Sequence, residues 1–207
     1  MKQILCFGDS NTYGLIPGTD ERYAWNERWT GILNDAVHKK GYRIIEEGLC
    51  GRTTVFGDPF RMGRKGSEML PVIMETHAPV DMVILMLGTN DCKTIYDACA
   101  GVIGKGIELL IDQVRSKAPA CRILLVSPIA LGDGVWEEGF DPEFNERSVQ
   151  TSKELSQVYQ RIAEEKGAYF LDASQYAVAD DADREHLNKE GHKNLAEAMC
   201  RFLEQIL

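Results

Sequence analysis

Five short apolar runs recur along this 207-residue chain, and stretches with helical patterning separate them. In the run at 82–87 every residue is apolar, which is typical of a parallel strand covered on both faces. The alternation of such runs with helical segments predicts an α/β fold, a three-layer α/β/α sandwich around a five-stranded parallel sheet. The expected strands lie at 3–7, 43–49, 82–87, 122–127 and 168–172.

Between these runs, apolar residues recur at helical spacing. Helices are expected at 28–40, around 68–76, at 96–117, at 145–166, and from Asn188, as the N-cap, to the C-terminus. Two longer loops, 15–27 and 130–146, combine glycine with aromatic residues, a composition that suits the wall of a pocket. The length favours one domain, 1–207.

Composition excludes several classes of function. The net charge is -9 and the basic residues form no block, so a nucleic-acid partner is not expected. No apolar run is long enough to span a bilayer, and the start lacks the features of a signal peptide, which predicts a cytoplasmic protein without a membrane partner. The six cysteines form no C-x-x-C pair and have no histidine cluster nearby, so we expect buried reduced thiols and no metal site.

Polar residues follow the first three expected strands. Ser10 comes after Gly8-Asp9, Gly51 follows the second strand, and Asn90 follows the third. Ligands of open parallel sheets bind beyond the carboxyl ends of the strands, so these loops should share one crevice. A serine hydroxyl, a glycine N–H and an asparagine amide are a nucleophile and two oxyanion donors, the parts that acyl transfer needs. We give Asp9 a structural role in the first turn.

A second polar segment precedes the last helix. Asp183 and His186 stand three residues apart, so the carboxylate can orient one imidazole nitrogen while the other faces a serine. His192 is a competitor, but it falls inside the expected helix and has Lys189 at the position of the acid. The two remaining histidines, His38 and His77, are assigned structural roles.

Alternative interpretations exist for each segment alone. Ser10 could cap a helix, and the turn 8–14 could belong to a flavodoxin-like module that binds phosphate or a nucleotide. That turn has no lysine and is not a P-loop, and such a module leaves Asp183 and His186 unexplained. An acyltransferase would use the same residues as an esterase. A catalytically dead interaction protein would require a damaged triad, and none is visible.

Taken together, the four segments resemble the GDSL or SGNH hydrolase family, whose name lists its Ser, Gly, Asn and His. The resemblance covers nearly the whole chain and implies the SGNH hydrolase fold, a flavodoxin-like arrangement. It implies Ser10 as nucleophile, with the amides of Ser10 and Gly51 and the side chain of Asn90 as the oxyanion hole. It also implies His186 as base and Asp183 as its partner.

A nearer likeness is to the bacterial arylesterase and acyltransferase branch. It rests on segments 46–49, 52–54, 58–59, 76–77 and 86–93. Members of that branch are similar in size, act on short acyl esters and often form oligomers. The chain departs from the pattern at Asn11, where the name GDSL has leucine, and at Gly51, where some members carry alanine. The first change would place a polar side chain beside the pocket.

The expected function is that of a serine esterase that hydrolyses short-chain, acetyl-like esters through an acyl-serine. The partner is a small-molecule ester, and no metal or organic cofactor is needed because side chains and backbone amides fill every role. The aromatic loops and the resemblance favour a homo-oligomer. The expected substrate pocket contains Asn11, Trp25 and Trp136.

Overall fold

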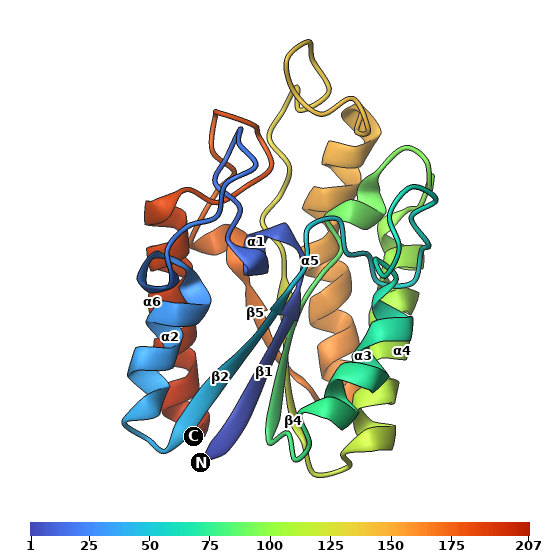
Figure 1. Cartoon of the computed structure of the whole chain (residues 1–207). Coiled ribbons are helices and arrows are strands. Elements are labelled where there is room, and N and C mark those ends of the chain that lie inside the picture. Colours follow the sequence, from blue (N-terminus) through green and yellow to red (C-terminus); the bar gives the residue numbers. More distant parts are fainter.

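Five parallel strands form one sheet in the order β2-β1-β3-β4-β5 (Figure 1). The computed structural model describes all residues, 1–207. Every expected strand is present and begins and ends within two residues of its predicted bounds, which confirms the α/β prediction. The strands are β1 (Lys2–Gly8), β2 (Tyr42–Gly48), β3 (Met82–Met86), β4 (Arg122–Ser127) and β5 (Tyr169–Asp172).

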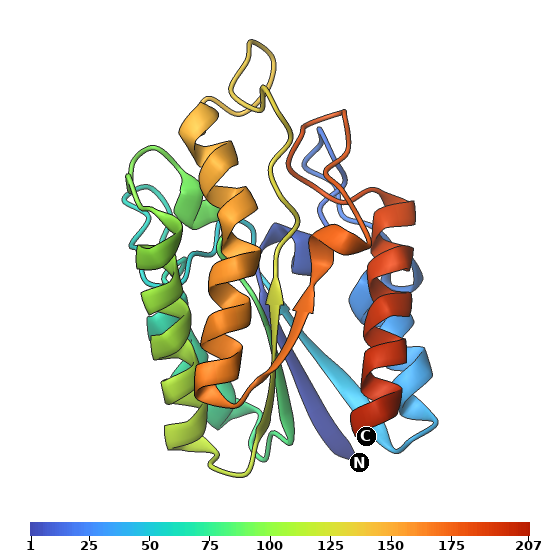
Figure 2. The ribbon, with the colours of Figure 1, turned by 180° about the vertical axis from the view of Figure 1, so that it is seen from behind.

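Helices cover both faces of the sheet. Figures 1 and 2 show α2 and α6 on one face and α3, α4 and α5 on the other. Helix α4 begins four residues later than predicted, because Asp97 adopts a left-handed backbone with φ of 45° that a helix cannot include. The helices are α1 (Ser10–Tyr13), α2 (Trp29–His38), α3 (Gly66–Thr76), α4 (Ala100–Lys117), α5 (Glu146–Lys166) and α6 (Lys189–Ile206), with short 3-10 helices η1 (Trp25–Glu27), η2 (Asn90–Cys92) and η3 (Ala173–Gln175).

Two apolar cores lie on opposite sides of the sheet. Along β1, Leu5 and Phe7 pack into the core of 27 buried residues under α3, α4 and α5. Their neighbours Ile4 and Cys6 pack into the core of 22 buried residues under α2 and α6. Successive residues of one strand therefore enter different cores, which is why the strand sequences are apolar without alternation.

The register of the central strands brings three loops together. Gly8 at the end of β1 pairs with Gly48 of β2 on one side and with Met86 of β3 on the other. The chain leaves β1 for an outer strand and then returns to β1's other side, so this edge is the topological switch point of the sheet. The loops containing residues 15–27, 130–146 and 177–188 rise above this edge, and both termini lie at the opposite end (Figures 1 and 2).

All six cysteines are free. Cys6 and Cys92 are buried, as expected, but Cys99 is exposed because it precedes α4 at the surface. None of the helices combines the length and the apolar character that crossing a membrane would require.

Candidate active site

Ser10 opens a one-turn helix directly beyond β1. Asp9 caps this helix, since its carboxylate accepts the backbone N–H of Asn11 at 3.0 Å, and Gly14 ends it in a left-handed conformation. The Ser10 side chain is buried, and its Oγ lies 2.8 Å from Nε2 of His186. The two groups come from opposite ends of the chain.

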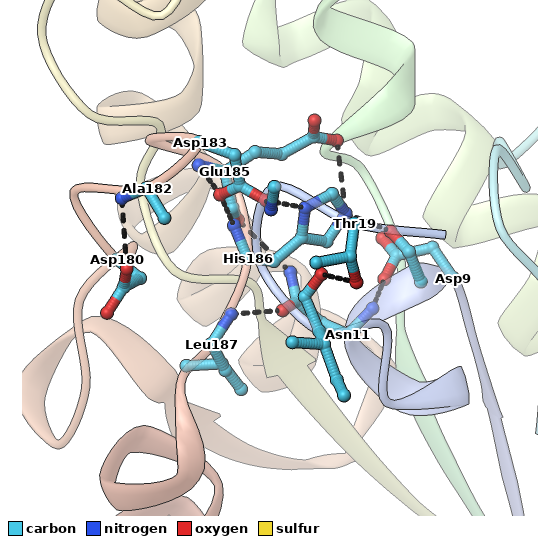
Figure 3. A network of polar contacts seen from close by, with 12 residues as sticks. Asp9, Asn11, Thr19, Asp180, Ala182, Asp183, Glu185, His186 and Leu187 are labelled. Carbon is cyan, nitrogen blue, oxygen red and sulfur yellow. Dashed lines mark hydrogen bonds and ion pairs between the residues drawn. The ribbon is translucent and has the colours of Figure 1, made fainter. Parts of the chain in front are cut away.

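The loop before α6 orients the imidazole of His186. Arg184 has φ of 60°, and this left-handed residue turns the chain back over Asp183. One carboxylate oxygen of Asp183 accepts the backbone N–H groups of Glu185 and His186, each at 2.9 Å. The other oxygen lies 2.7 Å from Nδ1 of His186 and also accepts the N–H of Gly18 at 2.9 Å. Asp183 thus holds one nitrogen of the imidazole (Figure 3), and the other nitrogen faces Ser10.

Asn11 joins this loop to the helix that carries Ser10. Its Oδ1 accepts the backbone N–H of Leu187 at 2.9 Å, and its Nδ2 donates to the carbonyl of Glu185 at 3.4 Å (Figure 3). The side chain is buried and both of its polar atoms are bound to backbone. Asn11 therefore links the two segments that carry the catalytic candidates, and its place beside the substrate pocket stays a prediction.

Carboxylates around His186 govern its proton affinity. Burial lowers the pKa of His186, but the negative charge of Glu185 and the bond and charge of Asp183 outweigh burial and raise that pKa to about 9. Burial raises the pKa of Asp183, yet its bond to His186 and the backbone N–H donors bring it down to about 2. The imidazole is accordingly a strong proton acceptor beside a carboxylate that stays ionised.

Three N–H donors are placed at the same edge of the sheet. Gly51 has φ of 81°, and its N–H is bonded to no acceptor in the protein. Asn90 is buried and uses one hydrogen of Nδ2 to bond the carbonyl of Arg52 at 3.2 Å, which leaves a second hydrogen to donate. The N–H of Ser10 stands at a helix start, where no intrahelical acceptor exists.

Buried charged groups hold these loops in place. Arg52 donates from Nη1 to the carbonyl of Gly8 at 2.9 Å and to that of Glu47, and so ties the loop after β2 to the ends of β1 and β2. Asp91 accepts the backbone N–H of Thr54 at 3.0 Å and also its hydroxyl, while burial raises the pKa of Asp91 to about 7. Sequence reasoning gave neither residue a role, although each stands next to a candidate oxyanion donor in the chain.

A groove of about 490 Å³ opens beside His186. Parts of both long loops line it, as the sequence suggested, but Trp25 and Trp136 are not among its residues. The guanidinium of Arg28 lies over the ring of Trp25, 5.2 Å from its centre. The place of both tryptophans in a substrate pocket stays a prediction. The lining residues are Leu15, Gly18, Thr19, Asp20, Gly139, Phe140, Asp141, Pro142, Ala182, Asp183, Glu185 and His186.

Glu185 is a further site residue that the sequence reasoning did not identify. Its carboxylate Oε1 lies 3.7 Å from Nε2 of His186, on the side that faces Ser10. The signal was present in the sequence, since an acid stands immediately before the histidine. No group of three or more His, Cys, Asp or Glu side chains is arranged to hold a metal ion.

Comparisons with known proteins place the chain in a family. Residues 6–193 match the model of the GDSL-like lipase/acylhydrolase family. Est24, a carbohydrate acetylesterase from Sinorhizobium meliloti, is 34% identical with a TM-score of 0.92, and the match covers 100% of both chains. The aryl esterase of M. smegmatis is 34% identical with a TM-score of 0.91, again over 100% of both chains.

A putative arylesterase from Agrobacterium tumefaciens is 32% identical with a TM-score of 0.88, over 100% of both chains. A search of curated proteins finds no match. The family match over most of the chain and the likeness of fold to these esterases agree with the resemblance that the four sequence segments indicated. The chain belongs to the GDSL-like lipase/acylhydrolase family, with the SGNH hydrolase fold, and is an ester-hydrolysing enzyme.

Proposed function

We propose that this enzyme is a serine esterase that removes short, acetyl-like acyl groups through an acyl-Ser10 intermediate. The observation that carries the proposal is the continuous chain of polar contacts, 2.8 Å from Ser10 to His186 and 2.7 Å from His186 to Asp183. A hydroxyl in contact with a base, which a carboxylate orients in turn, is the arrangement of an activated nucleophile.

Acylation begins when Ser10 Oγ attacks the ester carbonyl carbon and Nε2 of His186 takes the hydroxyl proton. The carbonyl oxygen becomes an oxyanion, which the N–H groups of Ser10 and Gly51 and the amide of Asn90 stabilise. The oxyanion then reforms the carbonyl and the carbon–oxygen bond of the ester breaks. The leaving alkoxide takes the proton from Nε2, so the alcohol departs neutral and the acyl group stays on Ser10.

Deacylation repeats these steps with water. His186 takes a proton from a water molecule as its oxygen attacks the acyl carbon, and the same donors stabilise the second oxyanion. Collapse breaks the bond to Ser10 Oγ, which recovers its proton from Nε2, and the carboxylic acid is released. Asp183 keeps the imidazole oriented and stabilises its protonated form throughout.

Two observations support a short acyl group. The groove beside His186 is polar, with Asp20, Asp141 and Glu185 among its residues, which suits neither a long alkyl chain nor an extended lipid. The relatives described above are named as a carbohydrate acetylesterase, an aryl esterase and a putative arylesterase.

A panel of esters graded by acyl length and leaving group tests the proposal on the wild type, Ser10→Ala and Asn90→Ala. Acetyl esters should be hydrolysed fastest, Ser10→Ala should lose the burst of acyl-enzyme, and Asn90→Ala should lose about a hundredfold to a thousandfold in kcat. Circular dichroism checks that both variants are folded. Full activity in folded Ser10→Ala would exclude the proposed nucleophile, and a preference for long acyl chains would exclude the proposed substrate class.

A further inference from the structure

The carboxylate of Glu185 is mostly buried, borders the groove, and receives no hydrogen bond from the protein. The residue is 7% exposed, and no N–H or O–H group of the protein bonds its carboxylate oxygens. Its one close charged contact is Nε2 of His186 at 3.7 Å (Figure 3). Because the protein supplies no donor to this carboxylate, it is free to accept a hydrogen bond from a ligand in the groove.

The carboxylate of Glu185 lies close to the position that the leaving alcohol would occupy. In the proposed reaction Nε2 of His186 returns its proton to the oxygen of the leaving alcohol, which must come within about 3 Å of that nitrogen. Glu185 Oε1 is 3.7 Å from the same nitrogen. The oxygen of the leaving alcohol and Oε1 of Glu185 therefore both lie close to Nε2 of His186. A hydroxyl on the carbon next to the ester oxygen can then reach the carboxylate of Glu185.

The charges around Glu185 restrict the kind of alcohol. Burial raises the pKa of Glu185, while the nearby charges of His186 and Lys93 favour its ionised form and those of Asp141 and Asp183 oppose it. Asp20 and Asp141 line the same groove. An alcohol that carries phosphate or carboxylate would be repelled by these acids, whereas a neutral alcohol with several hydroxyls can donate a hydrogen bond to the carboxylate of Glu185.

We propose that Glu185 is a specificity-determining residue whose carboxylate accepts a hydrogen bond from a hydroxyl adjacent to the ester oxygen, and that the enzyme therefore prefers acetyl esters of polyhydroxylic alcohols. This inference rests on the proposed esterase function. It adds the leaving-group class to that function and assigns it to one side chain.

The test compares two acetates with three-carbon alcohols, glycerol monoacetate and propyl acetate, which differ in the hydroxyls of the leaving group. The wild type should favour glycerol monoacetate in kcat/KM by about tenfold, a factor within the range for a hydrogen bond to a charged group. Glu185→Leu should abolish this preference, and Glu185→Gln, which keeps an acceptor oxygen, should retain part of it. Asp181→Asn is the matched control, because Asp181 is an exposed acid of the same loop outside the groove.

Each ratio is taken on the plateau of the pH profile, because Glu185 also acts on His186. Three acids raise the pKa of His186: Glu185, Asp183 and Asp9. His186 accepts the Ser10 proton only when it is neutral, so kcat/KM should rise with pH along a limb near pH 9 in the wild type, and removing the charge at residue 185 should move this rising limb to lower pH in both variants. Asp181→Asn should leave the limb in place. A limb that stays in place in folded Glu185→Gln would show that this carboxylate does not face Nε2.

The outcomes distinguish a failure of the role proposed for Glu185 from a failure of the proposed esterase function. If the wild type hydrolyses both acetates without preference, or if Glu185→Leu keeps the tenfold ratio, Glu185 does not select the alcohol, while the esterase proposal stands. If the wild type hydrolyses neither these acetates nor an aryl acetate, both proposals fall. Glu185→Gln, which preserves shape, carries the test if the leucine variant does not fold.

Discussion

Two buried histidines, six residues apart, occupy contrasting environments. His186 lies in the loop before α6 among carboxylates, and its pKa is raised to about 9. His192 lies in the second turn of α6, fully buried, where burial and the positive charge of Arg28 lower its pKa to about 4. The comparison teaches that neighbouring charges, more than burial itself, decide whether a buried imidazole can act as a base.

The contacts of the two rings differ accordingly. Nδ1 of His192 accepts the backbone N–H of Trp29 at 3.4 Å, its Nε2 has no partner, and the edge-on ring of Tyr23 lies 5.3 Å away. Three residues before it stands Lys189, which pairs with Glu27. No acid orients this ring and no hydroxyl faces it, so His192 serves as a packing residue between α2 and α6.

Matched substitutions give the largest expected difference between the two sites. His186→Gln removes the proposed base and should lower kcat for an acetyl ester by about 10⁴-fold or more. His192→Gln should stay within about threefold of the wild type, because glutamine can still accept the N–H of Trp29. Equal losses in two folded variants would show that the contrast in environment does not decide function.

A smaller effect is expected on the free energy of unfolding. The contributions of His192 and His186 to it depend on pH in opposite directions. The pKa of His192 falls on folding, so its contribution is present above the unfolded pKa of about 6.5 and is lost as pH falls toward 4, by about 3 kcal/mol. The pKa of His186 rises, so its contribution is complete below about 6.5 and is lost as pH rises through 9.

Urea unfolding at several pH values measures both contributions. His192→Gln should flatten the loss between pH 6.5 and 4, and His186→Gln should flatten the loss toward pH 9. If neither substitution changes its own window, the two rings do not differ in proton affinity as the structure indicates.

The fold could be predicted because its signals are local. Runs such as β3 are apolar at every position, and Asn188 caps α6 by accepting the N–H of Gly191, a bond between residues three apart. The late start of α4 was missed because the left-handed backbone of Asp97 is not encoded by any helix-breaking residue type.

Candidate site residues could be named from the sequence only where they form a pattern along the chain. The spacing of Asp183 and His186 is local, and the loops of Ser10 and Asn90 follow recognisable strands. The role of Asn11 depends on an approach between residues 176 apart, which no local pattern contains. The pocket role of Trp25 and Trp136 stays a prediction, because an aromatic side chain on a loop does not indicate which surface it contacts.

The most direct test of the whole account is covalent labelling with an alkyl fluorophosphonate, which reacts with activated serines. The wild type should gain one phosphonyl group that peptide mapping places on Ser10, His192→Gln should react at the wild-type rate, and His186→Gln should react at least about a hundredfold more slowly. Labelling of another residue, or equally fast labelling of His186→Gln, would contradict the claim that folding makes His186 the base for Ser10.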